Sequence, residues 1–221
     1  YEDVTNIDSV GIVTARAGVN VSGGQLLVGS GVTIGVAGIA TFRTGRIDVG
    51  DSLNNTGIGR DVLANITTGS YNIALGDAAL DANTTGNYNA AVGYAALGAN
   101  TTGGSNIAVG SGVLDANTTA SNNTAVGRNS LTASNANDNC AFGHSALKTN
   151  TTGTRNNAFG MAALELNTTG DYNAAFGYAS LYNNTTADYN SAYGHNALFA
   201  NTTGTSNVAI GAFALDANTT T

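Results

Sequence analysis

From about residue 55 onward, apolar and polar residues recur with a period of 17. A glycine that follows an apolar residue marks each unit, and these glycines are Gly59, Gly76, Gly93, Gly110, Gly127, Gly143, Gly160, Gly177, Gly194 and Gly211. Eight of the nine intervals are 17 residues, and the interval from Gly127 to Gly143 is 16. The unit reads Asn-x-Ala-Φ-Gly-x-x-Ala-Leu-x-x-Asn-Thr-Thr-Gly-x-x, where Φ is a larger apolar residue. A fixed period of this kind indicates a repeat architecture.

Each unit is too short for an ordinary helix and its return. Glycine and the Asn-Thr-Thr cluster are typical of turns, and Asn-x-Ala-Φ alternates with the period of a strand. We therefore expect two short strands per unit, around Asn-x-Ala-Φ and around x-Ala-Leu. One unit then forms one coil, and coils about 4.8 Å apart make a rod of roughly 48 Å. The predicted fold is an all-β, parallel β-roll or β-solenoid of ten coils of about 17 residues.

Stacked coils place equivalent residues in columns along the rod. The asparagine four residues before each glycine is predicted to form an amide ladder. Its members are Asn72, Asn89, Asn106, Asn123, Asn156, Asn173, Asn190 and Asn207, with Asn55 and Asn139 at the same place in their units. Alanine two before the glycine is expected where a second wall comes close. The Φ and leucine columns are expected to fill a narrow core.

Both faces of the predicted strand carry apolar groups, because asparagine and alanine point one way and Φ the other. One face can line the coil, and the other needs cover. Another copy of the chain is the simplest cover, so we expect a homo-oligomer. In the 16-residue unit the missing residue is expected in the turn, with the strands still in register.

Residues 1–50 follow another pattern. "GIVTARAG" (Gly11 to Gly18) recurs 27 residues later as "GIATFRTG" (Gly38 to Gly45). Alternating apolar residues follow each copy, which predicts strands separated by glycine turns. We expect a smaller β-rich neck or shaft module here, followed by the solenoid in residues 51–221. The chain opens with Tyr1 and stops inside a unit, so we expect a piece of a longer protein.

The amino-acid composition limits which classes of partner the chain can bind. The net charge is −7, and only 7 residues are basic, so the chain lacks the clustered cations that nucleic acid requires. No apolar run approaches 20 residues, so we expect no membrane insertion. The single cysteine, Cys140, excludes an internal disulfide and a cysteine-based zinc site. We expect no cofactor.

"NTTGNYNAAVGYAAL" (Asn83 to Leu97) and its copies resemble repeats of bacteriophage tail fibres, which often precede an endosialidase-type intramolecular chaperone domain. They are similar, more loosely, to the Ala-Ile-Gly repeats of YadA-type trimeric autotransporter heads. "GIVTARAG" and "GIATFRTG" resemble strand repeats in structural proteins of marine phages. The resemblance implies a homotrimer of left-handed β-rolls along a three-fold axis. It also implies an extracellular location, on a virion or a bacterial cell surface.

The function expected from these features is a structural or adhesive surface fibre. It would form a rigid trimeric rod that presents, or contributes to, host-receptor binding. Its partners would be its own copies, a host-surface glycan or protein receptor, and neighbouring fibre or virion proteins. The alternatives are an autotransporter-type adhesin head, a glycan-binding module and an ice-binding protein. We expect no enzyme, because no unit breaks the repeat to place paired carboxylates in a groove.

Recurring tyrosines are the candidate contact residues, since exposed aromatic rings stack on sugars. They are Tyr71, Tyr88, Tyr94, Tyr172, Tyr178 and Tyr189. Packing of these rings at the rim between subunits is an equal alternative. Adjacent threonines in a strand point in opposite directions, which argues against the flat threonine array of an ice-binding surface.

Other reactive residues are given structural roles. His144 and His195 lie three coils, or roughly 14 Å, apart, too far to share a metal. Cys140 is expected as a small packed residue and not a nucleophile. The acidic column of Asp81, Asp115, Glu165 and Asp216 is expected at a solvated edge.

Overall fold

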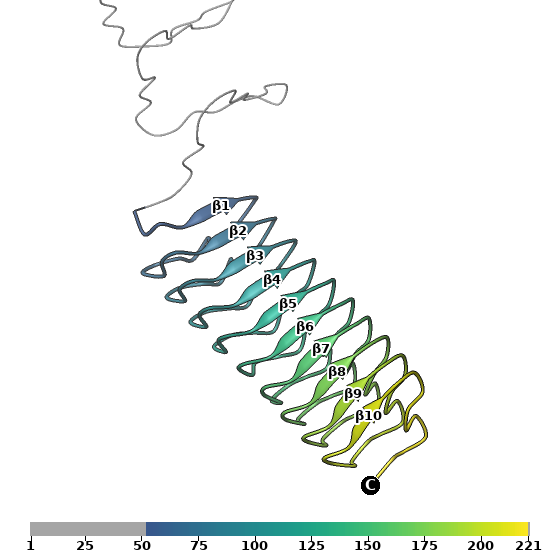
Figure 1. Ribbon diagram of the computed structural model, residues 1–221. Coiled ribbons are helices and arrows are strands. Elements are labelled where there is room, and N and C mark those ends of the chain that lie inside the picture. Colours follow the sequence, from purple (N-terminus) through teal and green to yellow (C-terminus); the bar gives the residue numbers. More distant parts are fainter. Residues whose placement is uncertain (1–51, 221) are drawn as a thin grey trace, which may run out of the picture. The chain divides into compact units, whose positions relative to one another are not determined.

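The computed structural model describes residues 52–220, which form a parallel β-solenoid (Figure 1). Each coil carries one strand of three residues. The strands are β1 (Thr56–Ile58), β2 (Ile73–Leu75), β3 (Ala90–Val92), β4 (Ile107–Val109), β5 (Thr124–Val126), β6 (Cys140–Phe142), β7 (Asn157–Phe159), β8 (Ala174–Phe176), β9 (Ser191–Tyr193) and β10 (Val208–Ile210). They form a single parallel sheet in sequence order. The predicted N-terminal module lies outside the described residues.

Equivalent residues pair across the sheet, as in Ala74 with Ala91 and Phe159 with Phe176. The register also continues across the 16-residue unit, where Thr124 pairs with Cys140 and Val126 with Phe142. The prediction that the missing residue falls in the turn is therefore confirmed.

A side chain replaces a backbone acceptor in this shortened turn. In other coils the acceptor is a threonine carbonyl: that of Thr101 accepts the backbone N–H groups of Thr84 and Thr85, and that of Thr84 accepts those of residues 67–69. In the short coil Asn135 Oδ1 accepts the N–H groups of Thr118 and Thr119 at 3.0 Å and of Ala120 at 3.3 Å. The donors of the preceding turn are thus satisfied with one residue fewer.

The prediction of a second strand around x-Ala-Leu is wrong. This segment is a turn, because left-handed backbone conformations alternate through it. Gly93, Ala95 and Leu97 have φ of 137°, 52° and 54°, and such alternation cannot form an extended run. The segment still bonds between coils, since the N–H of Leu97 donates to the carbonyl of Val113 at 3.0 Å.

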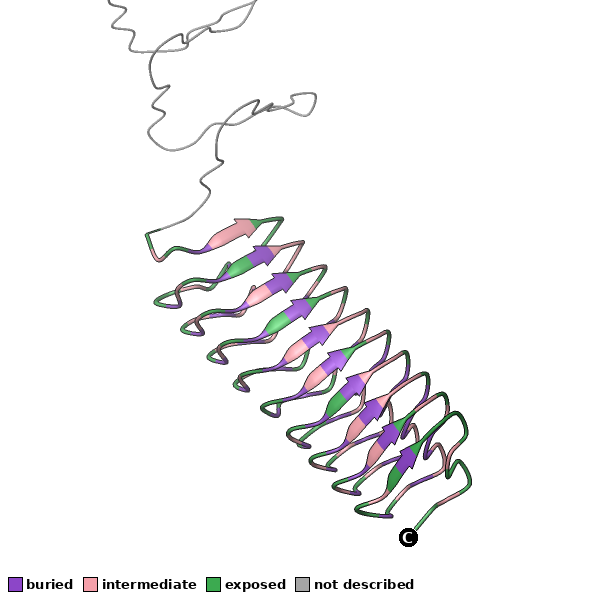
Figure 2. Ribbon diagram, viewed as in Figure 1, coloured by how far each residue is buried: buried purple, intermediate pink, exposed green. Residues whose placement is uncertain are grey.

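The interior is narrow and is filled by alanine and leucine. Figure 2 shows buried residues along the middle of the strands, where the alanines of β2–β10 lie, at most 3% exposed. At Gly57, which occupies the alanine column, a Cβ would lie 3.0 Å from Val62 Cγ1 on the opposite wall. The opposing leucines, such as Leu97, are fully buried.

The Φ column lies outside, so the expectation that it fills the core is wrong. Val92 is 36% exposed and Ile58 is 57% exposed. Asparagine and alanine point inward from the strand, and the pleat then directs Φ outward. The interior has room beside the strand for a methyl group only.

Candidate interaction face

The asparagines before the strands form a buried ladder. At β4, the backbone N–H and Nδ2 of Asn106 donate to Asn89 Oδ1 at 3.0 and 3.1 Å. Asn106 Nδ2 also donates to the carbonyl of Ala120 at 2.9 Å. In turn, Asn106 Oδ1 accepts the backbone N–H of Asn123 at 3.0 Å. This column therefore joins neighbouring coils and closes each coil onto its own turn.

The structure contains a second asparagine ladder that the sequence pattern did not predict. The Asn-Thr-Thr cluster was expected to form a turn only. Asn100 Nδ2 donates to Asn83 Oδ1 and to the carbonyl of Gly103, both at 3.0 Å. The column contains Asn83, Asn100, Asn117, Asn150, Asn167, Asn184, Asn201 and Asn218. The recurrence of asparagine at this place in eight units was the signal that could have revealed it.

The second ladder is interrupted in the short unit, where serine replaces asparagine at Ser134. Asn117 Oδ1 is buried and has no hydrogen-bond partner among residues 52–220. Asn150 Nδ2 reaches Ser134 Oγ at 3.4 Å. The shortened unit is therefore a defect in an otherwise continuous network.

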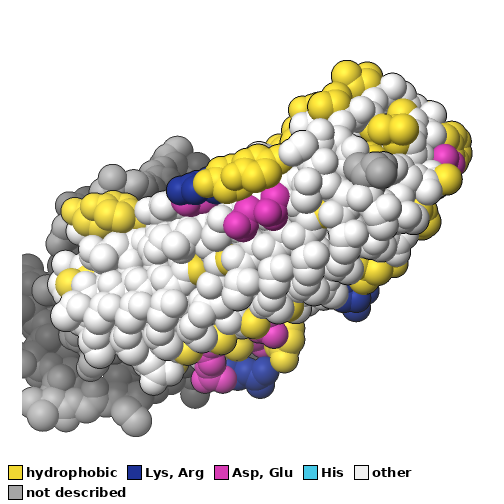
Figure 3. Space-filling model, turned by 90° about the horizontal axis from the view of Figure 1, so that it is seen from below, with side chains coloured by type: hydrophobic (Ala, Val, Ile, Leu, Met, Phe, Trp, Pro, Cys, Tyr) yellow, Lys and Arg dark blue, Asp and Glu magenta, His cyan; other side chains and the backbone are white. Residues whose placement is uncertain are grey.

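The first and third residues of β1–β10 form a continuous outward surface, which we call the outer strand face. It contains no charged residue in any coil. Ile73 is 49% exposed, Ile107 is 44% exposed and Tyr193 is 42% exposed. On the side of the solenoid seen in Figure 3, hydrophobic and charged side chains gather along the two edges, with a broad surface of other residues between them.

Along the second half of this face the rings stack. Phe142, Phe159, Phe176 and Tyr193 have successive ring centroids 4.8–4.9 Å apart and nearly parallel planes. Stacked rings cover one another's faces, so their edges face the surroundings.

The candidate tyrosines lie in two columns that border the outer strand face. One column lies five residues before the glycine that follows each strand and contains Tyr71, Tyr88, Tyr172 and Tyr189. The other lies directly after that glycine and contains Tyr94 and Tyr178. Tyr71 stacks on Tyr88 at 5.2 Å, and Tyr172 stacks on Tyr189 at 5.0 Å.

Tyr178 stacks on His195 at 5.0 Å. Tyr94 has no aromatic partner among the described residues and is 64% exposed, while Tyr88 is 63% exposed. The coil that follows these two tyrosines has the small residues Ser105 and Ser111 at the same places. Open ring faces therefore remain at Tyr88 and Tyr94, and also at Tyr189, which is 58% exposed and is followed by Ser206 at the same place in the next coil.

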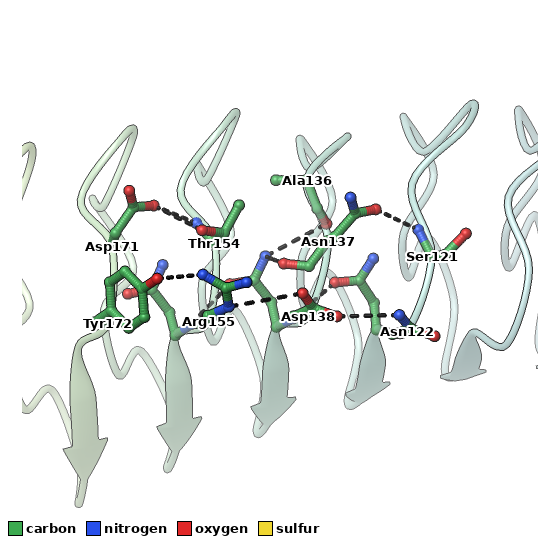
Figure 4. Close-up of polar contacts among 12 residues, drawn as sticks. Ser121, Asn122, Ala136, Asn137, Asp138, Thr154, Arg155, Asp171 and Tyr172 are labelled. Carbon is green, nitrogen blue, oxygen red and sulfur yellow. Dashed lines mark hydrogen bonds and ion pairs between the residues drawn. The ribbon is translucent and has the colours of Figure 1, made fainter.

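Polar side chains join coils along one border (Figure 4). Arg155 donates to Tyr172 Oη, and its guanidinium lies 5.2 Å from the Tyr172 ring centroid. Arg155 also lies 3.9 Å from Asp138. Asn122 Nδ2 donates to Asp138 Oδ1 at 3.1 Å. These groups pair with each other along the rod and do not converge on a common point.

The remaining candidate residues occupy packed or surface positions. His195 lies between Tyr178 and Phe213, whose ring centroid is 5.1 Å away. Cys140 begins β6, and burial raises the pKa of its thiol, which disfavours the reactive thiolate. Glu165 of the acidic column lies 3.7 Å from Lys148.

Within residues 52–220 no group of three or more His, Cys, Asp or Glu is placed to bind a metal, and no pocket is found. The same residues include no helix of the length and apolar character that crossing a membrane requires. The first threonine hydroxyl bonds to the next coil in most clusters, as where Thr84 Oγ1 donates to the carbonyl of Thr101 at 3.0 Å.

Comparison of the chain with protein-family models, curated proteins and solved structures finds no match. The fold and the side-chain arrangement are therefore the basis of the functional argument. They define a β-solenoid repeat protein with an uncharged, partly apolar outer strand face.

Proposed function

We propose that this chain is a structural or adhesive surface fibre, in which homotrimeric, left-handed solenoids form a stiff rod along a three-fold axis. The observation that carries the proposal is the outer strand face. It continues through all ten coils, carries no charge and leaves large apolar side chains exposed. Extended apolar surfaces of this kind mark sites of protein association.

The rest of the rod suits a mechanical role. Outside the short unit, the two asparagine ladders and the coil-to-coil backbone bonds repeat from coil to coil, so length grows by repetition. The fibre would be extracellular, on a virion or a bacterial cell surface, and would present or contribute to contact with a host glycan or protein. Neighbouring fibre or virion proteins would join its ends. An autotransporter-type adhesin head is the alternative setting for the same rod.

Sedimentation velocity and native mass spectrometry of the full chain test the assembly. We expect a trimer, and an aspartate on the outer strand face, Val126→Asp, should dissociate it because a buried charge is strongly unfavourable. Thr102→Asp, at an exposed turn, is the matched control and should remain trimeric. A stable wild-type monomer at micromolar concentration would refute the proposal.

A glycan-binding module is the second candidate, and the open ring faces of Tyr88 and Tyr94 favour it. A glycan array probed with the wild-type chain should give a signal that the Tyr88→Ala/Tyr94→Ala double variant loses. Tyr71→Ala, which removes a ring already stacked on Tyr88, should reduce the signal less. Absence of any array signal would remove this candidate.

Ice binding finds less support, since the first threonine hydroxyls already donate to carbonyls in the next coil.

A further inference from the structure

The Asn-Thr-Thr clusters also match the acceptor sequence for N-linked glycans, which is asparagine, any residue except proline, and then serine or threonine. Each asparagine of the second ladder is followed two residues later by threonine, as Asn100 is by Thr102. In secreted proteins this sequence is typical of an exposed loop that carries a glycan. The second ladder therefore contains eight acceptor sequences.

The fold closes these acceptors. Seven of the eight asparagines, all except Asn218 in the last coil, are 0% exposed. A glycan is attached to Nδ2, and the ladder is built with this atom: Asn100 Nδ2 donates to Asn83 Oδ1 and to the carbonyl of Gly103, both at 3.0 Å. The same pair of bonds is made by Asn117, Asn167, Asn184 and Asn201. Both amide protons of these residues are therefore in use.

The interior beside the amides has no room for a further group. A Cβ at Gly103 would lie 3.1 Å from Asn117 Nδ2, and a Cβ at Gly170 would lie 3.0 Å from Asn184 Nδ2. Even a methyl group at these places would press on the amides, and a sugar ring is much larger. Close-packed interiors do not accept such insertions without loss of stability.

We propose that N-glycosylation of the second ladder and folding of the solenoid exclude each other, so that a chain that meets the glycosylating enzyme before it folds does not form the rod. In this reaction the bond between C1 of the glycan and a polyprenyl diphosphate carrier breaks, C1 bonds to Nδ2, Nδ2 gives up one proton, and the diphosphate leaves. A modified asparagine has lost one of its two ladder bonds and carries a group that the coil cannot enclose.

Two other acceptor sequences lie on the outside of the coil. Asn65 and Asn122 each precede a threonine by two residues and are exposed. Asn65 Nδ2 donates to the carbonyl of Asp81 at 2.8 Å, and Asn122 Nδ2 donates to Asp138 Oδ1 at 3.1 Å, both at exposed places. Glycans on Asn65 and Asn122 project into solvent. They would show that a chain has met the enzyme without blocking its fold.

The exclusion concerns the fold of each copy and does not depend on self-assembly. It adds to the proposed surface fibre a condition on where the rod is made. The chain folds in a compartment that lacks the enzyme, and it reaches the surface with its second ladder already closed.

Expression of the full chain behind a signal peptide for the eukaryotic secretory pathway tests the inference. Protease resistance measures the folded fraction, and mass spectrometry after peptide N-glycosidase treatment maps the asparagines that carried glycans. We expect the wild-type chain to carry second-ladder glycans and to be protease-sensitive. A protease-resistant wild-type chain from this pathway would overturn the inference, whether its glycans lie in the second ladder or only on Asn65 and Asn122.

Matched variants separate the glycan from other causes of misfolding. The second threonine of each cluster, such as Thr85 or Thr102, is exposed, and its hydroxyl bonds to no other described residue. Alanine at all eight of these places removes the acceptor sequences and keeps both ladders. The alanine variant should carry glycans on Asn65 and Asn122 and give at least about tenfold more protease-resistant chain than the wild type, because the partners of its ladder amides stay satisfied.

Serine at the same eight places keeps the acceptor sequences, so the serine variant should behave as the wild type does. All three chains should fold when they are made in a bacterial cytoplasm, and the wild type should also fold in the secretory pathway when the enzyme is inhibited. A protease-resistant serine variant from the secretory pathway would contradict the inference. An alanine variant that folds in the cytoplasm but not in the secretory pathway would also contradict it, since a cause other than the glycan would then block folding.

Discussion

At the residue scale, the leucine column combines full burial with an uncommon backbone conformation. Leu114 is fully buried and has φ of 51°. The left-handed region is unfavourable for side chains in general and most unfavourable for β-branched ones. Leucine supplies the volume that the core needs while branching only at Cγ, which explains why no unit replaces it with valine or isoleucine.

Two substitutions of similar volume separate the effect of volume from that of backbone strain. We expect Leu114→Ile to lower the free energy of unfolding by about 1–3 kcal/mol more than Leu114→Met, because isoleucine branches at Cβ in a left-handed position. Urea unfolding followed by circular dichroism measures the difference. Equal stability of the two variants would show that the conformation imposes no constraint.

The asparagine ladders can place polar side chains in the interior because nearly all of their amide groups are hydrogen-bonded, with Asn117 Oδ1 beside the short unit as an exception. Asn106 Oδ1 accepts from Asn123, and Asn106 Nδ2 donates to the carbonyl of Ala120. Removal of the amide would leave several buried groups without partners. An unsatisfied buried group costs about 1–3 kcal/mol.

Asn106→Ala should therefore lower the free energy of unfolding by at least about 2 kcal/mol. Thr102→Ala, which changes an exposed turn residue, should alter it by less than about 0.5 kcal/mol. The measurement is again the urea midpoint. A similar midpoint for both variants would mean that the ladder adds no net stability.

At the scale of the element, the coil is defined more by its turns than by its strand. Only three residues per coil are extended, while the segment after Gly93 alternates between left-handed and other conformations. This alternation keeps N–H groups directed at the neighbouring coil without an extended chain. The short unit keeps its strand register because Asn135 supplies the acceptor that a backbone carbonyl supplies elsewhere.

A single substitution in the 16-residue unit should restore the interrupted second asparagine ladder. Ser134→Asn restores the residue found in this column in neighbouring units and gives Asn117 Oδ1 a donor. We expect the free energy of unfolding to rise by about 1 kcal/mol, the net value of a typical buried hydrogen bond. Ser134→Ala is the control and should not stabilise the chain. A loss of stability in Ser134→Asn would show that the shortened turn has no room for the amide.

At the scale of the whole molecule, stability is shared between neighbours. Each strand pairs only with the strand before it and the strand after it. A solenoid of this kind tolerates a change in the number of coils but not in the length of one coil's strand segment.

Deletion of one whole unit, residues 94–110, should leave a folded rod that is about 4.8 Å shorter. Small-angle scattering measures the length, and circular dichroism measures the retained β-structure. Deletion of residues 94–101 only, which breaks the 17-residue register, should unfold the surrounding coils. An intact fold after the partial deletion would contradict the coil-by-coil description.

The sequence by itself determined the period, the parallel stacking, the place of the missing residue and the central role of the asparagine column. Periodicity and identical residues at equivalent places carry that information, because each coil must bond to its copy. Only the tertiary structure decided which face is inward. The strand pattern allowed either, and the structure places the small residues inward because the neighbouring side chains lie close: at Gly57 even a Cβ would lie 3.0 Å from Val62 Cγ1.

The tertiary structure also decided that x-Ala-Leu is a turn and that Asn100 belongs to a second ladder. Both depend on backbone conformation at Leu97 and its equivalents, which an apolar pattern does not specify. Exposure of Φ follows from the same geometry, since the opposing leucines take the space that Φ was expected to fill. The outer strand face, on which the proposed function rests, is thus a consequence of packing inside the coil.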